Sequence, residues 1–377
     1  MTGVSRGGAP PVVLADYTTL GLGGPARTFV SAGSELSLID AVRSADRAGE
    51  PVLLIGGGSN LVISDGGFPG RVVHVNTRGF TYIDAGDGAV SVTVAAGEDW
   101  DDVVAATLAE GLAGLEPLSG IPGRAGATPI QNVGAYGREV AEVISQVRVY
   151  DRREDQIRVI TNESCGFSYR TSLFKSGRPE SLVSLPDGSR SQAAAQHRYV
   201  VLDVTFRLAR HSLSVPVRYT ELASELGIEV GEQAGAGEVR AAVIKIRARK
   251  GMVLNPGDPD TRSAGSFFTN PVITAEELAR IEAAAAGKGA GTVPRYPAGR
   301  GLVKVPAAWL IEHAGFAKGH GAPGPARVSS KHTLALVNTG DATTADLLAL
   351  AREIVSGVRA AYGVTLSPEP VFVGVTL

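Results

Sequence analysis

The sequence predicts an α+β protein with more than one domain. Its 377 residues suit two or three domains of about 100–200 residues each. Alternating apolar residues, typical of strands, are interspersed with helical spacing. After residue 250 the composition turns to loop-forming and Ala-rich segments. Gly (48) and Pro (21) are frequent but stay below the level of disordered chains, so we expect ordered, glycine-containing turns.

The composition excludes several classes of protein. With 36 Lys and Arg against 38 Asp and Glu, the formal charge of −2 provides no field that attracts nucleic acid or an acidic membrane. The single cysteine, Cys165, cannot form an intramolecular disulfide, and the first eleven residues lack the apolar stretch of a signal peptide. Without a long apolar run or a metal-binding His/Cys spacing, we expect a cytoplasmic protein with no membrane span and no metal.

The first half of the chain alternates helix and strand signals. Residues 1–12 are rich in Gly and Pro and predict a loose tail. Ser34 is a predicted helix cap, because an apolar stripe begins directly after it. The next predicted elements are helix 35–45, strands 52–55, 61–63, 72–75 and 89–95, helix 100–110, and strands 143–151, 156–160 and 199–208.

The second half is richer in helices. A helical pattern resumes at Glu238, and a turn-rich stretch, 251–265, separates it from the rest. We predict helices at 238–249, 275–286, 307–313 and 343–362, a loop at 293–301, a strand at 333–338 and a final strand at 364–366.

A glycine-rich loop, Gly56-Gly57-Gly58-Ser59-Asn60, comes directly after a buried strand. Consecutive glycines let the main chain approach an anion and point several N–H groups at it, which suits a pyrophosphate. An ordinary tight turn is the alternative. The loop fits neither a Rossmann fingerprint nor a P-loop, since residues 61–63 are strand-like and no Gly-x-x-x-x-Gly-Lys-Ser/Thr occurs.

A second long segment, 118–137, has no simple period. Small residues keep it thin, while Gln131, Asn132 and Tyr136 supply hydrogen-bonding groups. Such a loop suits the lining of a flat heteroaromatic ring, and a structural Ω-loop is the alternative.

Three polar residues outside these loops are candidates for chemistry. Arg170, in Ser168–Lys175, offers a planar fork for a carboxylate, unless it is a surface charge. Ser266 lies between a glycine and two phenylalanines without a recognisable base, so its hydroxyl suits proton donation to a carbanion or enol better than nucleophilic attack. A serine-capped turn is the alternative. Glu369 is either a carboxylate positioned by its two flanking prolines or a solvated terminal residue.

Together, these stretches resemble the UDP-N-acetylenolpyruvoylglucosamine reductase (MurB) family, the flavoenzymes of peptidoglycan precursor synthesis. The resemblance runs from 17–26 to Glu369 and includes 265–271 and 309–312, and the loop around Tyr219 is similar to that of type I members. It implies a two-part FAD-binding α/β region of the PCMH or vanillyl-alcohol-oxidase type, followed by a C-terminal α+β substrate-binding domain. We expect an N-terminal FAD subdomain at 1–80, a second at 81–250 and the substrate domain at 251–377.

The resemblance also implies roles for individual residues. Arg170, Ser266 and Glu369 are expected to be catalytic. Tyr219, Lys250, Asn270 and His332 are expected to bind substrate, although His332 stands where type I relatives often carry glutamine. Expected cofactor-binding residues are Gly56, Gly57, Gly58, Ser59, Asn60, Ser119, Gly120, Ile121, Pro122, Gly123, Gly126, Ala127, Gln131, Asn132, Gly134, Ala135, Tyr136 and Arg247.

The implied activity uses FAD as cofactor and NADPH as co-substrate. NADPH would reduce the flavin, whose N5 would pass hydride to C3 of UDP-N-acetylglucosamine enolpyruvate. Ser266 would protonate C2, giving UDP-N-acetylmuramate for cell wall biogenesis, cell shape and cell division. We expect a monomer. Two alternatives stay open: an FAD oxidase of a sugar or phenol, and a flavin- or nucleotide-binding module without catalysis.

Overall fold

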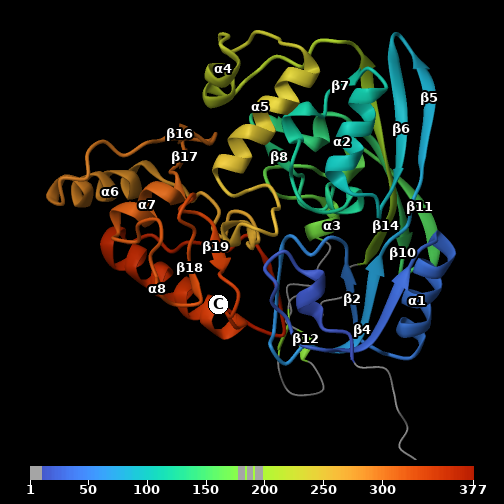
Figure 1. Cartoon of the computed structure of the whole chain (residues 1–377), viewed down its shortest axis with the longest axis horizontal. Coiled ribbons are helices and arrows are strands. Elements are labelled where there is room, and N and C mark those ends of the chain that lie inside the picture. Colours follow the sequence, from blue (N-terminus) through green and yellow to red (C-terminus); the bar gives the residue numbers. More distant parts are fainter. Residues whose placement is uncertain (1–10, 177–182, 185–189, 192–197) are drawn as a thin grey trace, which may run out of the picture.

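A computed structural model of the chain describes residues 11–176, 183–184, 190–191 and 198–377. Most of the predicted N-terminal tail, residues 1–10, lies outside the described residues. The chain forms several β-sheets with helices packed around them (Figure 1), and the predicted α+β class is confirmed.

The N-terminal part is a small parallel sheet with one covering helix. Its strands lie in the order β1 (Ala26–Ala32), β4 (Phe68–Val75) and β2 (Val52–Ile55). Helix α1 (Glu35–Arg47) connects β1 to β2 and begins at Ser34, whose side chain accepts from the backbone N–H of Ser37. Its apolar stripe is buried at Leu38, Val42 and Ala45, so packing and capping both favour the predicted helix.

A larger antiparallel sheet comes next along the chain. Its order is β11 (Gln156–Thr161), β10 (Ile144–Asp151), β14 (Tyr199–Arg210), β6 (Ala89–Ala95) and β5 (Phe80–Gly86), with β7 (Leu112–Ala113) also paired to β14. Burial alternates along β6, as the apolar alternation predicted. Around this sheet lie α2 (Trp100–Ala109), α3 (Leu173–Ser176), α4 (Thr220–Leu226), α5 (Ala236–Arg249), and the short strands β8 (Gly134–Ala135), β9 (Arg138–Glu139), β12 (Val183–Ser184) and β13 (Arg190–Ser191).

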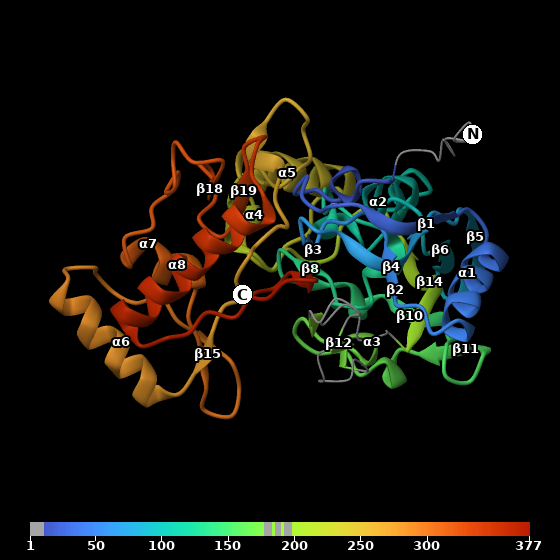
Figure 2. The ribbon, with the colours of Figure 1, turned by 90° about the horizontal axis from the view of Figure 1, so that it is seen from below.

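The C-terminal part combines helices with short strands. Its elements are β15 (Val272–Ile273), α6 (Ala275–Gly287), β16 (Tyr296–Pro297), β17 (Val303–Lys304), α7 (Ala307–His313), β18 (Ala326–Val328), β19 (Leu336–Asn338) and α8 (Thr344–Tyr362). The chain then runs back across the molecule (Figure 2), and β20 (Val371–Val373) pairs in parallel with β3 (Leu61–Ile63), directly after the glycine loop.

Further contacts fasten this part to the N-terminal part. Two backbone N–H groups at the start of α8, those of Thr344 and Ala345, donate to the carboxylate of Asp65 at 2.8 and 3.2 Å. The Asn338 side chain donates to the carbonyl of Leu20 at 2.9 Å. Apolar residues from before position 80, Leu20, Leu22 and Val62, belong to the core of the C-terminal helices. These residues connect the parts of the chain on either side of the predicted domain boundaries. The domain boundaries at residues 80 and 250 stay a prediction.

The structure corrects two predicted strands. Residues 364–366 are not a strand: they are irregular, with Val364 and Leu366 buried in the C-terminal core, and the last strand is β20. The predicted strand 333–338 is confined to Leu336–Asn338, because Thr333–Ala335 form a turn. Strands β1 and β5 were not predicted. In the described part of the chain, no helix has the length and apolar character needed to cross a membrane.

Candidate active site

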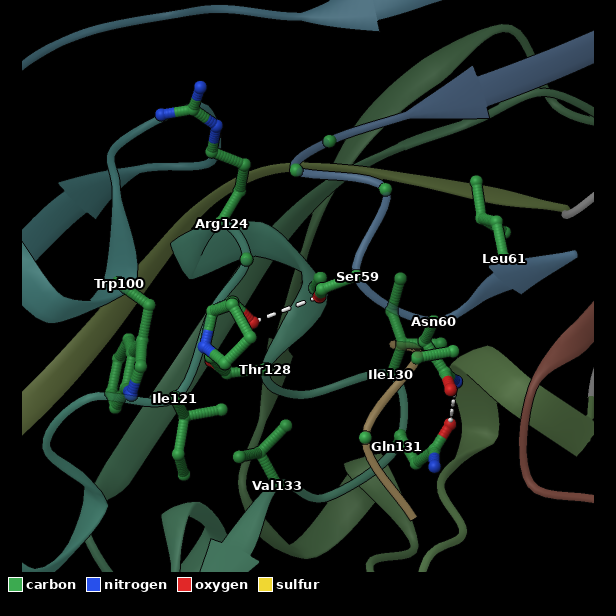
Figure 3. A pocket seen from close by; sticks show the side chains of 18 of the residues that line it. Ser59, Asn60, Leu61, Trp100, Ile121, Arg124, Thr128, Ile130, Gln131 and Val133 are labelled. Atoms are coloured by element: carbon green, nitrogen blue, oxygen red, sulfur yellow. Dashed lines mark hydrogen bonds between the residues drawn. The ribbon is translucent and has the colours of Figure 1, made fainter. Parts of the chain in front are cut away.

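A cleft of about 510 Å³ lies where the N-terminal part, the large sheet and the C-terminal part meet (Figure 3). The glycine loop and the thin loop from Ile121 to Tyr136 contribute nearly half of the residues that line it. The side chains of Leu53, Trp100 and Val133 make part of it apolar, and Arg170, Ser266 and Glu369 add polar groups. An apolar pocket with a few convergent polar groups is the usual form of a cofactor or substrate site.

The glycine loop packs closely against neighbouring backbone, including that of the thin loop. Gly58 has a φ of 60°, and a Cβ there would lie 1.9 Å from the carbonyl oxygen of Tyr17. A Cβ on Gly57 would lie 2.8 Å from Cα of Gly123 in the other loop. The Ser59 hydroxyl donates to the carbonyl of Pro122 at 2.9 Å (Figure 3). Glycine is therefore required at 57 and 58 by contact with neighbouring backbone.

The thin loop is held by helices α2 and α5. Asp101 on α2 accepts from the N–H of Gly120 at 2.6 Å and from both terminal nitrogens of Arg240 on α5 at 2.6 and 2.9 Å. Burial acts to raise the pKa of Asp101, but these donors outweigh it and lower the pKa overall. Arg247, also on α5 and buried, donates to the carbonyl of Gly120 at 3.2 Å.

These loops fit a dinucleotide cofactor. The backbone N–H groups of residues 57–60 make no hydrogen bond within the described residues, although the loop is only partly exposed. Such unpaired donors at a glycine-rich turn suit phosphate oxygens. The apolar wall formed by Trp100, Ile121 and Val133 suits a flat ring (Figure 3). FAD, which has both parts, fits the residues that are present.

Glu369 lies at the centre of a polar cluster. Its Oε1 accepts from Nε2 of Gln131 at 2.7 Å and is 3.3 Å from Nε of Arg170, an ion-pair distance without hydrogen-bond alignment. Its backbone N–H donates to the carbonyl of Phe267 at 2.9 Å, and Pro368 pairs with Phe268. Because these two segments are paired, Ser266 and Glu369 reach the same cleft although they are distant in the sequence.

Arg170 is held in a strained turn. The backbone groups of Ser168 and Thr171 bond to each other at 3.0 Å in both directions, and Arg170 between them has a φ of 55°. Its Nη2 donates to the carbonyl of Gly134 at 3.3 Å. Asn132 and Tyr136, beside the cleft, also have left-handed backbones, with φ of 44° and 51°. Strain of this kind, at non-glycine residues, concentrates at functional sites.

A second group of polar residues also lines the cleft. The Tyr136 and Tyr219 rings meet edge to face, 5.5 Å between centroids. Burial raises the pKa of Tyr136 to about 12, so its hydroxyl stays protonated. Nζ of Lys250 is 2.5 Å from Oε2 of Glu221. Burial, helped by the charge of Lys250, lowers the pKa of His332 to about 4, so this ring is neutral at pH 7.

Four of the predicted site residues do not line the cleft. Ser119 and Gly120 lie behind it, where the Ser119 hydroxyl donates to the carbonyl of Glu116 at 2.7 Å. The buried Asn132 donates to Glu139 at 2.7 Å, holding the loop from behind. Asn270 faces a neighbouring cavity and accepts from the N–H of Ala307. All other predicted site residues line the cleft.

Sequence reasoning also missed part of the lining. These residues are Leu53, Leu54, Leu61, Val75, Ala96, Trp100, Arg124, Thr128, Ile130, Val133, Tyr199, Val200, Val201, Met252, Ala264, Gly265 and Val371. Four of them, Arg124, Thr128, Ile130 and Val133, fall within the predicted loop and were open to prediction. The strand residues carried no signal beyond their apolar pattern.

Comparison with known proteins is consistent with this geometry. Residues 258–373 match the family model of the UDP-N-acetylenolpyruvoylglucosamine reductase C-terminal domain, and residues 26–159 match an FAD binding domain. Over 368 residues the chain is 54% identical to the UDP-N-acetylenolpyruvoylglucosamine reductase of Thermobifida fusca, covering 97% of this chain and 98% of the relative. The chain belongs to the UDP-N-acetylenolpyruvoylglucosamine reductase family.

Other members of the UDP-N-acetylenolpyruvoylglucosamine reductase family agree. The Streptomyces coelicolor protein is 53% identical over 367 residues, covering 97% of this chain and 90% of the relative. The crystal structure of the Thermus caldophilus reductase (MurB) superposes with a TM-score of 0.58 at 26% identity, covering 97% and 98% of the two chains. The predicted family, the FAD-binding domain and the class of FAD-containing oxidoreductase are therefore confirmed.

Proposed function

We propose that this chain uses NADPH and bound FAD to reduce the enolpyruvyl double bond of UDP-N-acetylglucosamine enolpyruvate, forming UDP-N-acetylmuramate. The observation that carries the proposal is the convergence of Arg170, Ser266 and Glu369 on the cleft that the two glycine-containing loops line. The names of the relatives support the substrate. FAD, when bound and reduced, supplies the hydride for this chemistry.

Each catalytic side chain has a role that its surroundings support. Arg170, held by the carbonyl of Gly134 and by Glu369, stabilises negative charge that develops beside the substrate carboxylate. Ser266, whose hydroxyl makes no hydrogen bond within the described residues, donates a proton to C2. Glu369 acts in its protonated form or through hydrogen bonds, because a bare anion beside an enolate opposes the reaction. Hydride at C3 and the proton at C2 complete the addition.

The residues that bind substrate are proposals of the same kind. Lys250, Tyr219 and His332 line the cleft, and we propose that they bind the UDP-sugar. Lys250 is already paired with Glu221, so a diphosphate would compete with that carboxylate. Asn270 would act through its amide nitrogen, since its oxygen is used by Ala307. Gly120, Ser119 and Asn132 would support FAD by holding the loop.

Two half-reactions test the proposal. Purified protein is expected to be yellow and to bleach with NADPH when oxygen is absent. UDP-N-acetylglucosamine enolpyruvate is then expected to restore the flavin absorbance and to yield UDP-N-acetylmuramate. Rapid reoxidation by oxygen with no response to the UDP-sugar would favour an oxidase instead, and a colourless protein unable to take up FAD would contradict both.

We further propose that the protein is a cytoplasmic monomer acting in peptidoglycan precursor synthesis, and so in cell wall biogenesis, cell shape and cell division, without binding nucleic acid or membrane. The near-balanced charge supports the absence of a nucleic-acid partner. Sedimentation at micromolar concentration tests the monomer, and depletion of the protein with analysis of UDP-linked precursors tests the cellular role.

A further inference from the structure

A chain of three hydrogen-bonded side chains leads from the glycine loop to Glu369. Nδ2 of Asn60 donates to Oε1 of Gln131 at 2.9 Å (Figure 3), and Nε2 of Gln131 donates to Oε1 of Glu369 at 2.7 Å. The three residues come from the glycine loop, the thin loop and the C-terminal segment. The backbone supports the same arrangement, because the N–H of Val371 donates to the carbonyl of Asn60 at 2.9 Å.

We infer that Gln131, oriented by Asn60, is a positioning residue for Glu369: it keeps Oε1 of that carboxyl group as an acceptor and leaves Oε2 for the substrate. The inference deepens the proposed function and rests on it. The family resemblance assigned Asn60 and Gln131 to cofactor binding. Their amides are instead turned toward each other and toward Glu369.

The direction of the chain of hydrogen bonds is set by the chemistry of a carboxamide. Such a group has one acceptor end and one donor end. Since the Gln131 oxygen is taken by Asn60, its nitrogen must face Glu369. Reversing the amide would place nitrogen against nitrogen and oxygen against oxygen. With Nδ2 of Asn60 facing Gln131, the nitrogen end of Gln131 is the end that meets the carboxyl group.

The arrangement also gives the two carboxyl oxygens of Glu369 different surroundings. Oε1 accepts from Gln131 and lies beside the Arg170 guanidinium, so a proton there would displace a donor. Oε2 has no hydrogen-bond partner in the part of the chain that the structure describes. The nearby titratable or charged groups are Arg170 and Tyr169. Nζ of Lys304 lies over the Tyr169 ring, 4.6 Å from its centroid. Glu369 therefore presents Oε2 to the substrate while Gln131 and Arg170 hold Oε1.

Rapid kinetics of the two half-reactions test this role in the FAD-loaded enzyme. Gln131→Leu is expected to leave reduction by NADPH unchanged and to slow reoxidation by UDP-N-acetylglucosamine enolpyruvate by up to about a hundredfold, as misplacement of a reacting group does. Glu369→Gln should slow the same step, and the double variant should be no slower than the slower single one. Gln233→Leu is the matched control, because Gln233 has the same side chain and donates to the carbonyl of Ser214 but does not line the cleft.

The outcomes separate this inference from the proposed function. If the UDP-sugar fails to reoxidise the wild-type enzyme, both are overturned. If it succeeds but Gln131→Leu loses FAD or slows reduction by NADPH, Gln131 is a cofactor ligand and the positioning role is overturned. Independent sites have effects that multiply, so effects of Gln131→Leu and Glu369→Gln that multiply in the double variant would also overturn it.

A conservative variant gives a second, independent readout. Gln131→Glu keeps the shape of the side chain but places a carboxyl group against Oε1 of Glu369. Two adjacent carboxyl groups share one proton, which then makes the hydrogen bond that the amide made. We expect reoxidation by the UDP-sugar to be slow at high pH and to recover as pH falls. A pH profile unchanged from that of the wild type would contradict the positioning role.

Discussion

At the scale of single residues, Ser266 is the clearest test of the chemistry. Its hydroxyl lines the cleft beside the segment that carries Glu369. Ser266→Ala removes the proposed proton donor without touching the glycine loop. We expect anaerobic reduction by NADPH at the wild-type rate and turnover of the enolpyruvyl substrate reduced by about 10²–10⁴-fold, the usual contribution of a positioned acid. Loss of both half-reactions in stopped-flow absorbance would contradict the role of Ser266 as proton donor.

His332 makes a prediction about pH. Burial and the charges of Lys250, Lys318 and Arg247 lower its pKa to about 4, from an ordinary value of 6.5. Between these values the unfolded chain binds more protons than the folded one, so stability falls as pH falls from about 6.5 towards 4. We expect His332→Gln to lose less stability over this range in urea unfolding. If the free energy of unfolding fell equally with pH in the two proteins, His332 would not be a buried neutral ring.

At the scale of elements, the glycine loop depends on close contact with neighbouring backbone. Gly58→Ala would incur the backbone cost of a left-handed alanine, about 1–2 kcal/mol, and would also force its Cβ against the carbonyl of Tyr17. Gly88→Ala is the matched control: it has a φ of 70° in an exposed turn with open space around it. We expect Gly88→Ala to show the backbone cost alone, with normal FAD affinity, and Gly58→Ala to lose more stability and to bind FAD weakly. Thermal unfolding and flavin titration measure both, and equal losses would contradict the close approach.

How much of each element the sequence predicts depends on whether its stabilising contacts are local. Helix α1 was predicted because its cap, Ser34, and its apolar stripe are close together in the sequence. Strand β20 was not, because Val371–Val373 is a strand only through pairing with Leu61–Ile63, about 310 residues earlier in the chain. Separation along the sequence also explains why only part of the candidate site could be predicted. Glu369 was predicted from its neighbours, but its bond to Gln131 depends on tertiary contacts that no local pattern reports.

At the scale of the whole molecule, strand β20 makes the C-terminal segment part of the proposed cofactor site. It pairs with β3 directly after the glycine loop, and Val371 bonds to Asn60 inside that loop. A ligand that orders residues 56–60 should therefore also order residues 367–373, because binding free energy stabilises every contact that the bound state requires. Hydrogen exchange with and without FAD measures this. We expect the cofactor to slow exchange in both segments and to leave helix α6, which does not line the cleft, unchanged. If FAD slows hydrogen exchange only in residues before 250, the C-terminal segment is not ordered together with the glycine loop.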